Sequence, residues 1–577
     1  MADKDHKKLH AIMIAYPLQG HIIPTVHLAI KLASKGVTIT FINTQPIHHQ
    51  ISKSNPPPPP PSSTAVDGGD FFAGARNSGL DIRYATVCDG LPLGFDRSLN
   101  HDQFMECLLH VFSAHVDELV GKIVRSELES ECPVTCLIAD TFFVWPSVIA
   151  KKYNLVHVSF WTEPALVLTL YYHLELLRKN GHFASHGEKR EGNREGMEEA
   201  DVKRGGKKRD SVSLGSPNPK KFSDIHFQRF SHPENFSGLH NPEKIPSQRN
   251  SLNPKNFSSL HKREDTIDYI PGVRSIKPTD LMSYLQATDI GTVVHRIIYK
   301  AFEDTKRADV IVCNTIQELE PETISALNQK KPTYAIGPIF PTGFTKSTVA
   351  MSLWSESDCT HWLDTKPHGS VLYISFGSYA HTSKHDILEI AHGLLRSGVS
   401  FVWVIRPDIV SSEDLDFLPV GFEANVKGRG VIVPWCCQID VISHSAIGGF
   451  LTHCGWNSIL ESVWCSVPLI CFPLLTDQFT NRKLVVDDWK VGINLCDERS
   501  ITREEVAEKI NRLMYGKTSD QIRKKIKKMR KVLEDALASD GSSQRNFDQF
   551  IEDLKIKVSQ RNGIATWQHE DASSNHA

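Results

Sequence analysis

The sequence predicts an α/β fold of two lobes, each built on a parallel sheet that helices cover. Short apolar runs alternate with amphipathic, helix-like stretches through both halves of the chain, which is the pattern of strands joined by crossover helices. The chain of 577 residues is too long for one domain with a single hydrophobic core, because such cores stop growing at roughly 250–300 residues. Turn residues interrupt the pattern between residues 337 and 354, so we place the join between the lobes there.

The first half begins with an apolar run over residues 9–16 that predicts a strand. Residues 22–34 have a helical period, and Gly36 ends that helix. Three further apolar runs predict strands of the same sheet: 37–43, 136–140 and 310–314. The second half repeats the pattern, and its predicted strands are 370–375, 401–405, 431–433, 449–453 and 467–471.

These elements give a predicted division of the chain. Residues 1–340 form the N-terminal lobe, 341–354 the linker and 355–550 the C-terminal lobe. Residues 551–577 are expected to be the end of a C-terminal helix and a tail.

Two segments of the first half depart from this alternation. Residues 192–264 are rich in charged and small polar residues, cannot bury enough apolar surface to offset the entropy of ordering, and are predicted to be disordered. Lys-Arg-Glu occurs at both 189–191 and 262–264, which suggests an in-frame insertion; the alternative is that the basic cluster 205–209 is a nuclear signal or a surface anchor. The six prolines at 56–61 predict a mobile surface loop.

Composition excludes several classes of protein. A formal net charge of −2 does not favour nucleic acid, and no apolar run reaches the roughly 18 residues of a membrane span. The run at 9–16 is too short and wrongly flanked for a signal peptide, so we expect a cytoplasmic protein. The 12 cysteines lack zinc-ribbon spacing, and we expect most of them to be small buried residues with free thiols. The Asp-Leu-Asp at 414–416 is interpreted as solvated surface and not as a metal site.

The stretch from residue 435 to 478 is the most informative. It reads WCCQIDVISHSAIGGFLTHCGWNSILESVWCSVPLICFPLLTDQ and resembles the 44-residue signature of plant small-molecule UDP-glycosyltransferases. The matching positions are Trp435, Gln438, His444, Gly448 to Phe450, His453 to Ser458, Glu461, Ser462, Val467, Pro468, Asp477 and Gln478. The likeness extends over nearly all of the chain outside 192–264, and it implies the GT-B fold, in which two Rossmann-like lobes face each other across a cleft.

The same stretch has the chemistry of a site for a nucleotide diphosphate. A strand turns into a helix near Trp456, so free backbone N–H groups and the helix dipole favour a pyrophosphate there. Asn457, Ser458 and His453 add side-chain donors. Glu461 lies one turn beyond Asn457 on the same face, where a carboxylate can accept both ribose hydroxyls.

Residues outside that helix suit the other parts of a UDP-sugar. Trp435 ends a strand and can stack on uracil, with Gln438 close to the base or the ribose. Asp477 and Gln478 follow another strand and suit sugar hydroxyls; in the family a Gln here accompanies glucose donors, which implies UDP-glucose. The segment 375–378, which follows the strand 370–375, resembles the first loop of the C-terminal lobe in the family. The resemblance implies that Ser378 is a second contact to the diphosphate.

A histidine and an aspartate form the predicted catalytic pair. His21 lies in Gly-His-x-x-Pro, at the start of a helix whose positive end disfavours an imidazolium, so the ring can act as a general base. Asp140 closes a different parallel strand, and the carboxyl ends of neighbouring strands share one crevice. The surrounding segment also resembles the one that supplies the partner carboxylate in the family. Phe142, Phe143, Trp145 and Trp161 are candidates for an apolar acceptor pocket.

The resemblance implies inverting, metal-independent transfer of a hexose, here glucose, to a hydroxyl or similar nucleophile of a small lipophilic acceptor, giving a β-glycoside. It implies no cofactor, UDP-glucose as a co-substrate, and a monomer. Two alternatives stay open: a UDP-sugar-binding protein whose catalysis the insertion impairs, and a nicotinamide-dependent oxidoreductase, for which the Gly-x-Gly-x-x-Gly motif is missing. Cys436-Cys437 and Ser466 depart from the family pattern, and Ser466 stands where a glycine is usual.

Overall fold

A computed structural model describes residues 8–54, 70–183, 265–341, 343–344, 352–410, 417–496 and 500–574. The predicted proline loop 56–61, the predicted insertion 192–264 and the Asp-Leu-Asp at 414–416 lie outside these residues.

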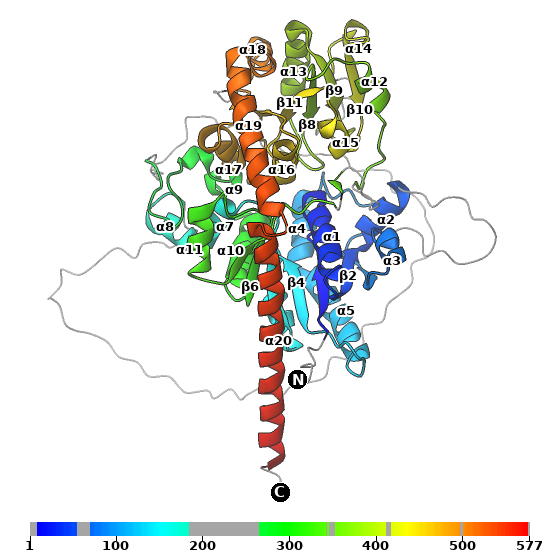
Figure 1. Cartoon of the computed structure of the whole chain (residues 1–577), viewed down its shortest axis with the longest axis vertical. Helices are drawn as coiled ribbons and strands as arrows, with labels where there is room; N and C mark the ends of the chain where they lie inside the picture. Colours follow the sequence, from blue (N-terminus) through cyan, green and yellow to red (C-terminus); the bar gives the residue numbers. More distant parts are fainter. Residues whose placement is uncertain are drawn as a thin grey trace, which may run out of the picture. The chain divides into compact units, whose positions relative to one another are not determined.

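The first sheet has seven parallel strands in the order β3-β2-β1-β4-β5-β6-β7 (Figure 1). The strands are β1 (His10–Ile14), β2 (Thr38–Thr44), β3 (Ile82–Val87), β4 (Cys136–Asp140), β5 (Val156–Trp161), β6 (Val310–Cys313) and β7 (Thr333–Ala335). Nearly every residue of β1, β2, β4, β5 and β6 is buried, because helices cover both faces of the sheet.

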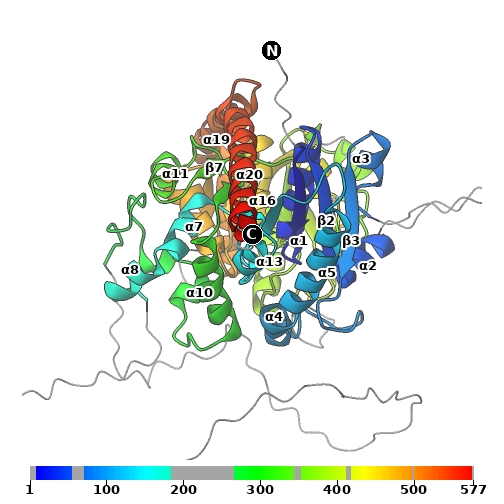
Figure 2. The same ribbon diagram turned by 90° about the horizontal axis from the view of Figure 1, so that it is seen from below.

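Two hydrophobic cores flank the strands of this sheet. On one face, α1 (Gln19–Ala33) and α20 (Ser542–Ser574) pack on the sheet, and α4 (His101–His110) and α5 (Phe112–Ser126) pack on the other (Figure 2). The other helices of this part are α2 (Gln45–Ser54), α3 (Ala73–Asn77), α6 (Pro146–Lys152), α7 (Ala165–Tyr172), α8 (Leu174–Lys179), the 3-10 helix η1 (Pro278–Asp280), α9 (Ser283–Gln286), α10 (Val293–Thr305) and α11 (Pro321–Asn328).

The second sheet has six parallel strands in the order β10-β9-β8-β11-β12-β13. The strands are β8 (Val371–Ser375), β9 (Ser400–Val404), β10 (Gly430–Val433), β11 (Ile447–Thr452), β12 (Leu469–Cys471) and β13 (Gly492–Asn494). The helices are α12 (Thr360–Asp364), α13 (Lys384–Ser397), α14 (Phe422–Asn425), α15 (Gln438–Ser443), α16 (Trp456–Trp464), α17 (Gln478–Lys483) with the π-helical turn η3 (Leu484–Asp488), α18 (Arg503–Met514) and α19 (Gly516–Leu537).

Both sheets have a topological switch point, where the strand order reverses. It lies between β1 and β4 in the first sheet and between β8 and β11 in the second. Ligands of such folds bind outside the carboxyl ends of the strands at this point. The residues that follow β1, β4, β8 and β11 are therefore the ones that the fold places for function.

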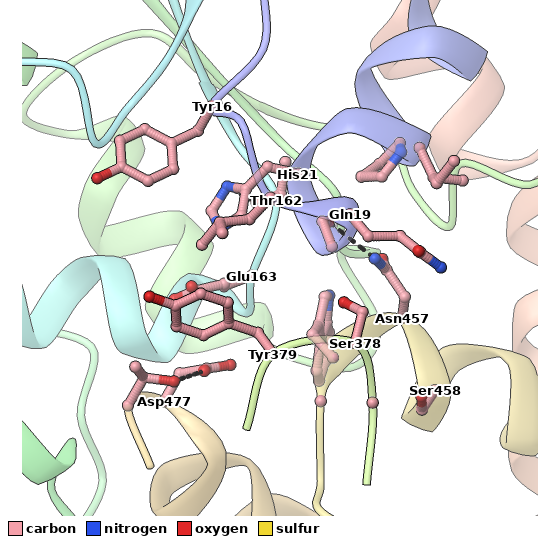
Figure 3. A pocket seen from close by; sticks show the side chains of 18 of the residues that line it. Tyr16, Gln19, His21, Thr162, Glu163, Ser378, Tyr379, Asn457, Ser458 and Asp477 are labelled. Carbon is pink, nitrogen blue, oxygen red and sulfur yellow. Dashed lines mark hydrogen bonds between the residues drawn. The ribbon is translucent and has the colours of Figure 1, made fainter. Parts of the chain in front are cut away.

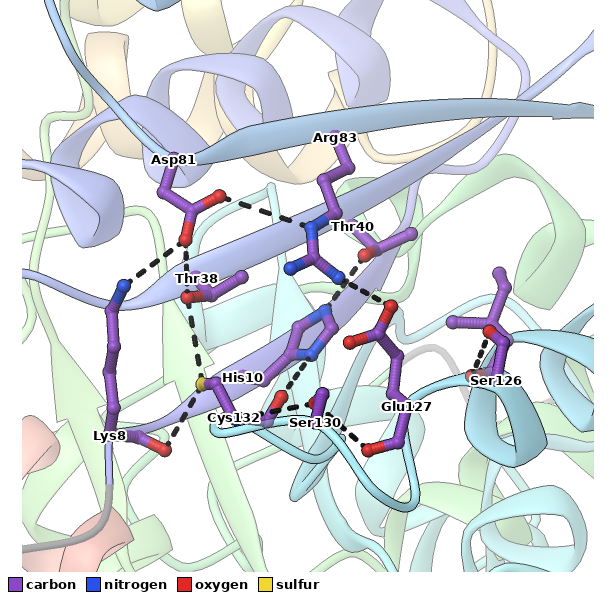
Figure 4. Close-up of polar contacts among 11 residues, drawn as sticks. Lys8, His10, Thr38, Thr40, Asp81, Arg83, Ser126, Glu127, Ser130 and Cys132 are labelled. Carbon is purple, nitrogen blue, oxygen red and sulfur yellow. Dashed lines mark hydrogen bonds and ion pairs between the residues drawn. The ribbon is translucent and has the colours of Figure 1, made fainter.

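At the amino ends of the strands, polar contacts that range from buried to exposed hold the first sheet together (Figure 4). His10 Nε2 lies 2.8 Å from Thr40 Oγ1, and its Nδ1 lies 3.0 Å from the carbonyl oxygen of Cys132. Asp81 accepts hydrogen bonds from Thr38 and Lys8. These contacts tie together the beginnings of β1, β2 and β3, away from the edge where the ligand sites are expected.

The predicted strands are all present, but the sequence analysis omitted β3, β5, β7 and β13. It also began the first helix too late, because α1 starts at Gln19 and not at residue 22. Residues up to 550 were assigned to the second lobe, yet Phe547 and Phe550 lie in the core of the first sheet. Helix α20 returns there from α19, which is why the boundary cannot follow the chain in order.

Ser466 is a strained residue just beyond the end of α16. Its φ of 58° is left-handed, and the N–H groups of Ser466 and Val467 bond back to Val463 O (3.0 Å) and Ser462 O (2.9 Å), which is the glycine-favouring cap expected from the family pattern. We expect Ser466→Gly to stabilise the protein by about 1 kcal/mol, because glycine has no Cβ to strain. Urea unfolding followed by fluorescence checks this, and an unchanged or lower midpoint would show that the serine is not strained.

All 12 cysteines lie among the described residues and are free thiols. In the part of the chain that the structure describes, no helix is both long enough and apolar enough to cross a bilayer.

Candidate functional site

A cavity of about 290 Å³ lies between the carboxyl ends of the two sheets (Figure 3). It is lined by residues that follow β1 and β5 of the first sheet and β8, β11 and β12 of the second. Every residue predicted to bind the donor lines it: Ser378, Trp435, Gln438, His453, Trp456, Asn457, Ser458, Glu461, Asp477 and Gln478.

His21 and Asp140 meet at the switch point of the first sheet. The imidazole Nδ1 lies 2.8 Å from Asp140 Oδ2 and 3.0 Å from the hydroxyl of Thr162. Because Asp140 is almost fully buried and Nδ1–H donates to it, the tautomer is fixed and Nε2 is left with its lone pair. His21 lines the cavity, whereas Asp140 lies behind it. The geometry is that of a base held in place by a carboxylate.

The N-terminus of α16 faces the same cavity from the second lobe. Its N-cap is Gly455, so no side chain occupies the first N–H groups of the helix. Asn457 Nδ2 donates to the carbonyl oxygen of Gly20 at 2.9 Å, which joins this helix to the start of α1, where His21 lies. The N-terminus of α16 in one lobe and His21 in the other are therefore neighbours.

His453 lies under this helix end, between two glycines. A Cβ added at Gly377 would lie 2.5 Å from His453 Nε2, and one at Gly455 would lie 2.6 Å from it. Burial, and to a lesser degree Arg406, lowers the pKa of the His453 imidazole to about 4, so the ring is neutral. A neutral ring has one N–H to donate, and the two glycines leave room for the ring beside the start of α16.

Arg406 supports the loop after β8 from below. Its guanidinium is fully buried and donates to the carbonyl oxygens of Gly377 and Ala380, and to Asp408 Oδ1 at 2.9 Å. The loop that it holds carries Ser378 and Tyr379, both of which line the cavity. Arg406 was not predicted from the sequence, because a lone arginine after a strand gives no signal without the loop that it contacts.

Glu461 and Gln438 form a polar pair farther along α16. Gln438 Nε2 donates to Glu461 Oε2 at 2.7 Å and to Ser458 Oγ at 2.9 Å. Burial raises the pKa of the Glu461 carboxyl to about 7, and the hydrogen bond from Gln438 opposes part of that rise. This carboxyl is a buried acceptor that a pair of neighbouring hydroxyls can satisfy.

Trp435 is at the lip of the cavity beside Trp354. The two indoles are stacked, with ring centroids 5.9 Å apart. Because Trp435 also lines the cavity, its ring offers a flat surface to a base.

Asp477 is the N-cap residue of α17, and Gln478 is the first residue of that helix. Asp477 accepts hydrogen bonds from Thr476 Oγ1 and Asn481 Nδ2. Gln478 Oε1 accepts from the N–H groups of Leu474 (2.9 Å) and Leu475 (3.0 Å), so the NH₂ group is the one that can reach a ligand. Both side chains are thus held rigidly at the wall.

Only one of the four aromatic residues predicted for the acceptor pocket lines the cavity. Phe142 does, whereas Phe143, Trp145 and Trp161 are buried in the cores of the first lobe. Trp161 Nε1 donates to Pro164 O, which turns its indole inward. The apolar lining next to His21 comes from residues that the sequence analysis did not select: Tyr16, Met105, Tyr171, Tyr284, Val294, Ile297 and Ile298.

Thr162 and Glu163 were also missed. They follow β5, and the rule that parallel strands share a carboxyl edge would have selected them if that strand had been predicted. Within the described ranges, no group of three or more His, Cys, Asp or Glu side chains has a geometry that could hold a metal ion.

Comparisons with known proteins fit this site. The family described as UDP-glucoronosyl and UDP-glucosyl transferase matches residues 356–533. UDP-glycosyltransferase 86A1 of Arabidopsis thaliana is 52% identical over 557 residues (96% of each chain), and UDP-glycosyltransferase 86A2 of the same plant is 52% identical over 563 residues (97% of each chain).

Solved structures share the fold. Medicago truncatula UGT71G1, complexed with UDP-glucose, has a TM-score of 0.65 at 22% identity, over 96% of this chain and 99% of that one. Phytolacca americana UGT2, complexed with UDP-2fluoro-glucose and pterostilbene, has a TM-score of 0.65 at 22% identity, over 95% and 99%. The two sheets are therefore the Rossmann-like lobes of a GT-B fold. With the site, the fold and these relatives together, the chain belongs to the plant UDP-glycosyltransferases and is a glycosyltransferase that moves a sugar from a UDP-sugar to a small molecule.

Proposed function

We propose that the protein transfers glucose from UDP-glucose to a hydroxyl or similar nucleophile of a small lipophilic acceptor, with inversion, giving a β-glycoside. The observation that carries the proposal is the contact of His21 with Asp140, directly beside the helix end that suits a pyrophosphate. A relative from Catharanthus roseus, 30% identical over 565 residues, is named 7-deoxyloganetin glucosyltransferase, which supports glucose as the sugar.

In the proposed reaction, His21 Nε2 takes the proton of the acceptor hydroxyl while the oxygen attacks the anomeric carbon. Asp140 stabilises the imidazolium that forms, because its carboxylate is already bonded to Nδ1–H. The C–O bond to the diphosphate breaks on the opposite face, so the configuration inverts in one displacement.

The leaving diphosphate gains charge as that bond breaks. We propose that the N–H groups at the start of α16, the neutral ring of His453 and the side chains of Asn457, Ser458 and Ser378 donate to it, since all of these residues line the cavity. Fixed donors at a site of developing charge lower the barrier without reorganisation. Because these groups accept the charge, the proposed reaction needs no metal ion.

The rest of the donor has partners along the wall. Trp435 stacks on uracil, Glu461 with Gln438 receives the ribose, and Asp477 with Gln478 contacts the sugar. Phe142 and the apolar residues near His21 receive the acceptor. The free thiols accord with a reducing compartment, and we propose a cytoplasmic monomer.

The transfer itself is tested with UDP-glucose and a panel of phenols and lipophilic alcohols. We expect UDP release together with a product of glucosyl mass whose proton spectrum has the coupling of a β-anomer. An α-glycoside would contradict inversion, and UDP binding without turnover for any acceptor would favour a protein with lost catalysis.

The acidity of Glu461 gives a pH dependence of donor binding. Its pKa of about 7 means that the carboxyl is mostly protonated below that pH and ionised above it. An ionised carboxyl accepts both ribose hydroxyls, so we expect the affinity for UDP-glucose to rise about tenfold between about pH 6 and about pH 8.

Calorimetry with UDP-glucose checks this dependence, since the diphosphate of that donor does not titrate in the same range. Glu461→Gln should bind more weakly, with an affinity that no longer changes with pH. An affinity that falls as the pH rises in the wild type would show that the protonated acid is the binding form.

A further inference from the structure

Glu163 is a buried acid that lines the cavity, and one of its carboxyl oxygens is buried without a hydrogen-bond partner. It follows β5, next to Thr162, whose hydroxyl contacts His21 (Figure 3). The residue is only 9% exposed, it lines the cavity, and its Oε2 has no hydrogen-bond partner. A buried polar atom without a hydrogen-bond partner lowers the stability of the fold. When such an atom belongs to a residue of a ligand site, it indicates that the ligand supplies the missing hydrogen bond.

Glu163 does not have the structural role that its position suggests. It lies just before α7, where an acidic side chain usually caps the helix. However, the N–H groups of Ala165 and Leu166 donate to Glu320 instead, at 3.0 and 2.7 Å. Because Glu320 caps α7, the Glu163 carboxyl is not needed to cap this helix.

The neighbours of Glu163 locate the space that it faces. Burial is the main cause that raises the pKa of its carboxyl well above the ordinary value, and the carboxyls of Asp477 and then Asp140 raise it further. Asp477 comes from the opposite lobe, and its two oxygens already accept hydrogen bonds from Thr476 and Asn481. In Figure 3 the Glu163 side chain lies between those of His21, the proposed base, and Asp477, the proposed sugar contact.

We propose that Glu163 is a second sugar-binding residue, whose carboxyl group exchanges hydrogen bonds with a hydroxyl of the transferred hexose. This inference rests on the proposed function. A protonated carboxyl offers one donor and one acceptor, as a sugar hydroxyl does, so the two groups can satisfy each other. Lysine and arginine are absent from the described residues that line the cavity, so the site suits a neutral hexose and not a uronic acid.

The test compares Glu163→Leu, which removes the hydrogen-bonding group, with Glu163→Gln, which keeps a donor and an acceptor. We expect Glu163→Leu to lower kcat/KM for UDP-glucose about 10- to 100-fold and Glu163→Gln to lower it less than about threefold. UDP has no sugar, so its Kd should stay within about twofold of the wild type in both variants. Glu303→Leu, which changes an exposed glutamate of α10, is the matched control and should keep the wild-type values.

Three further readings decide the role of the residue. Hydrolysis of UDP-glucose without an acceptor should fall in parallel with transfer, whereas a loss limited to the KM of the acceptor would overturn the assignment to the sugar. The ligand-free Glu163→Leu protein should unfold at the wild-type temperature or above it, because an unpartnered acid is replaced by an apolar group; lower values in both variants would mean a structural carboxyl. Wild-type protein should use UDP-glucuronate at least about 100-fold less well than UDP-glucose.

The outcomes separate this inference from the proposed function. Wild-type activity in Glu163→Leu, or an equal loss in both variants, would overturn the inference and leave the proposed function intact. A folded wild-type protein that does not bind UDP would overturn both.

Discussion

Replacement of His21 by alanine is expected to lower kcat about 10²- to 10⁴-fold, the range that a positioned general base contributes. Of the pair His21 and Asp140, only His21 can reach the acceptor hydroxyl, because Asp140 lies buried behind the ring. The variant therefore has no base at this position. The acceptor would then have to lose its proton to water. Donor binding should persist, since the groups that suit UDP belong to the other lobe.

The measurement is the steady-state rate with UDP-glucose, together with the Kd of UDP by calorimetry. His110→Ala, an exposed histidine of α4, is the matched control and should leave both quantities unchanged. Asp140→Asn should also be slow, because an amide can hold the ring but cannot stabilise the imidazolium. If His21→Ala retained more than about a tenth of the wild-type kcat, the ring would not be the base.

Replacement of His453 by alanine is expected to lower kcat/KM for UDP-glucose about 10²- to 10³-fold, as the loss of one donor to a developing oxyanion does elsewhere. The neutral ring fits between Gly377 and Gly455, and neither of these residues has a side chain that could replace its N–H. In contrast to His21→Ala, this variant should also bind UDP more weakly.

Rates and UDP affinity are again the quantities to measure. His368→Ala, an exposed histidine before β8, is the control for the loss of a histidine in the same lobe. His453→Gln should recover part of the activity, because a carboxamide keeps an N–H donor. Wild-type UDP affinity in folded His453→Ala would show that the ring does not contact the diphosphate.

The sequence predicted the parts of the site that depend on chain-local patterns. The turn from β11 into α16 can be found from apolar residues followed by Cys454-Gly455, and it carries His453, Asn457, Ser458 and Glu461 together. Asp140 could be placed near His21 because β1 and β4 are neighbouring parallel strands, and the structure has them hydrogen-bonded.

Features that depend on distant contacts could not be predicted in this way. All four residues predicted for the acceptor pocket are aromatic: Phe142, Phe143, Trp145 and Trp161. Only the packing of the folded chain decides which of these rings faces the cavity. The short strands β7 and β13 have three residues each, too few to show a period. The free state of Glu163 depends on Glu320, which lies more than 150 residues away and caps α7 in its place.

Calorimetric titration of UDP into the wild type, His21→Ala and His453→Ala tests the central claim most directly. If a UDP-sugar lies in the cavity with its diphosphate on α16 and its sugar toward His21, the wild type and His21→Ala should bind one UDP with similar affinity, and His453→Ala should bind it much more weakly. Folded wild-type protein without affinity for UDP, or a loss of binding in His21→Ala and not in His453→Ala, would contradict the account.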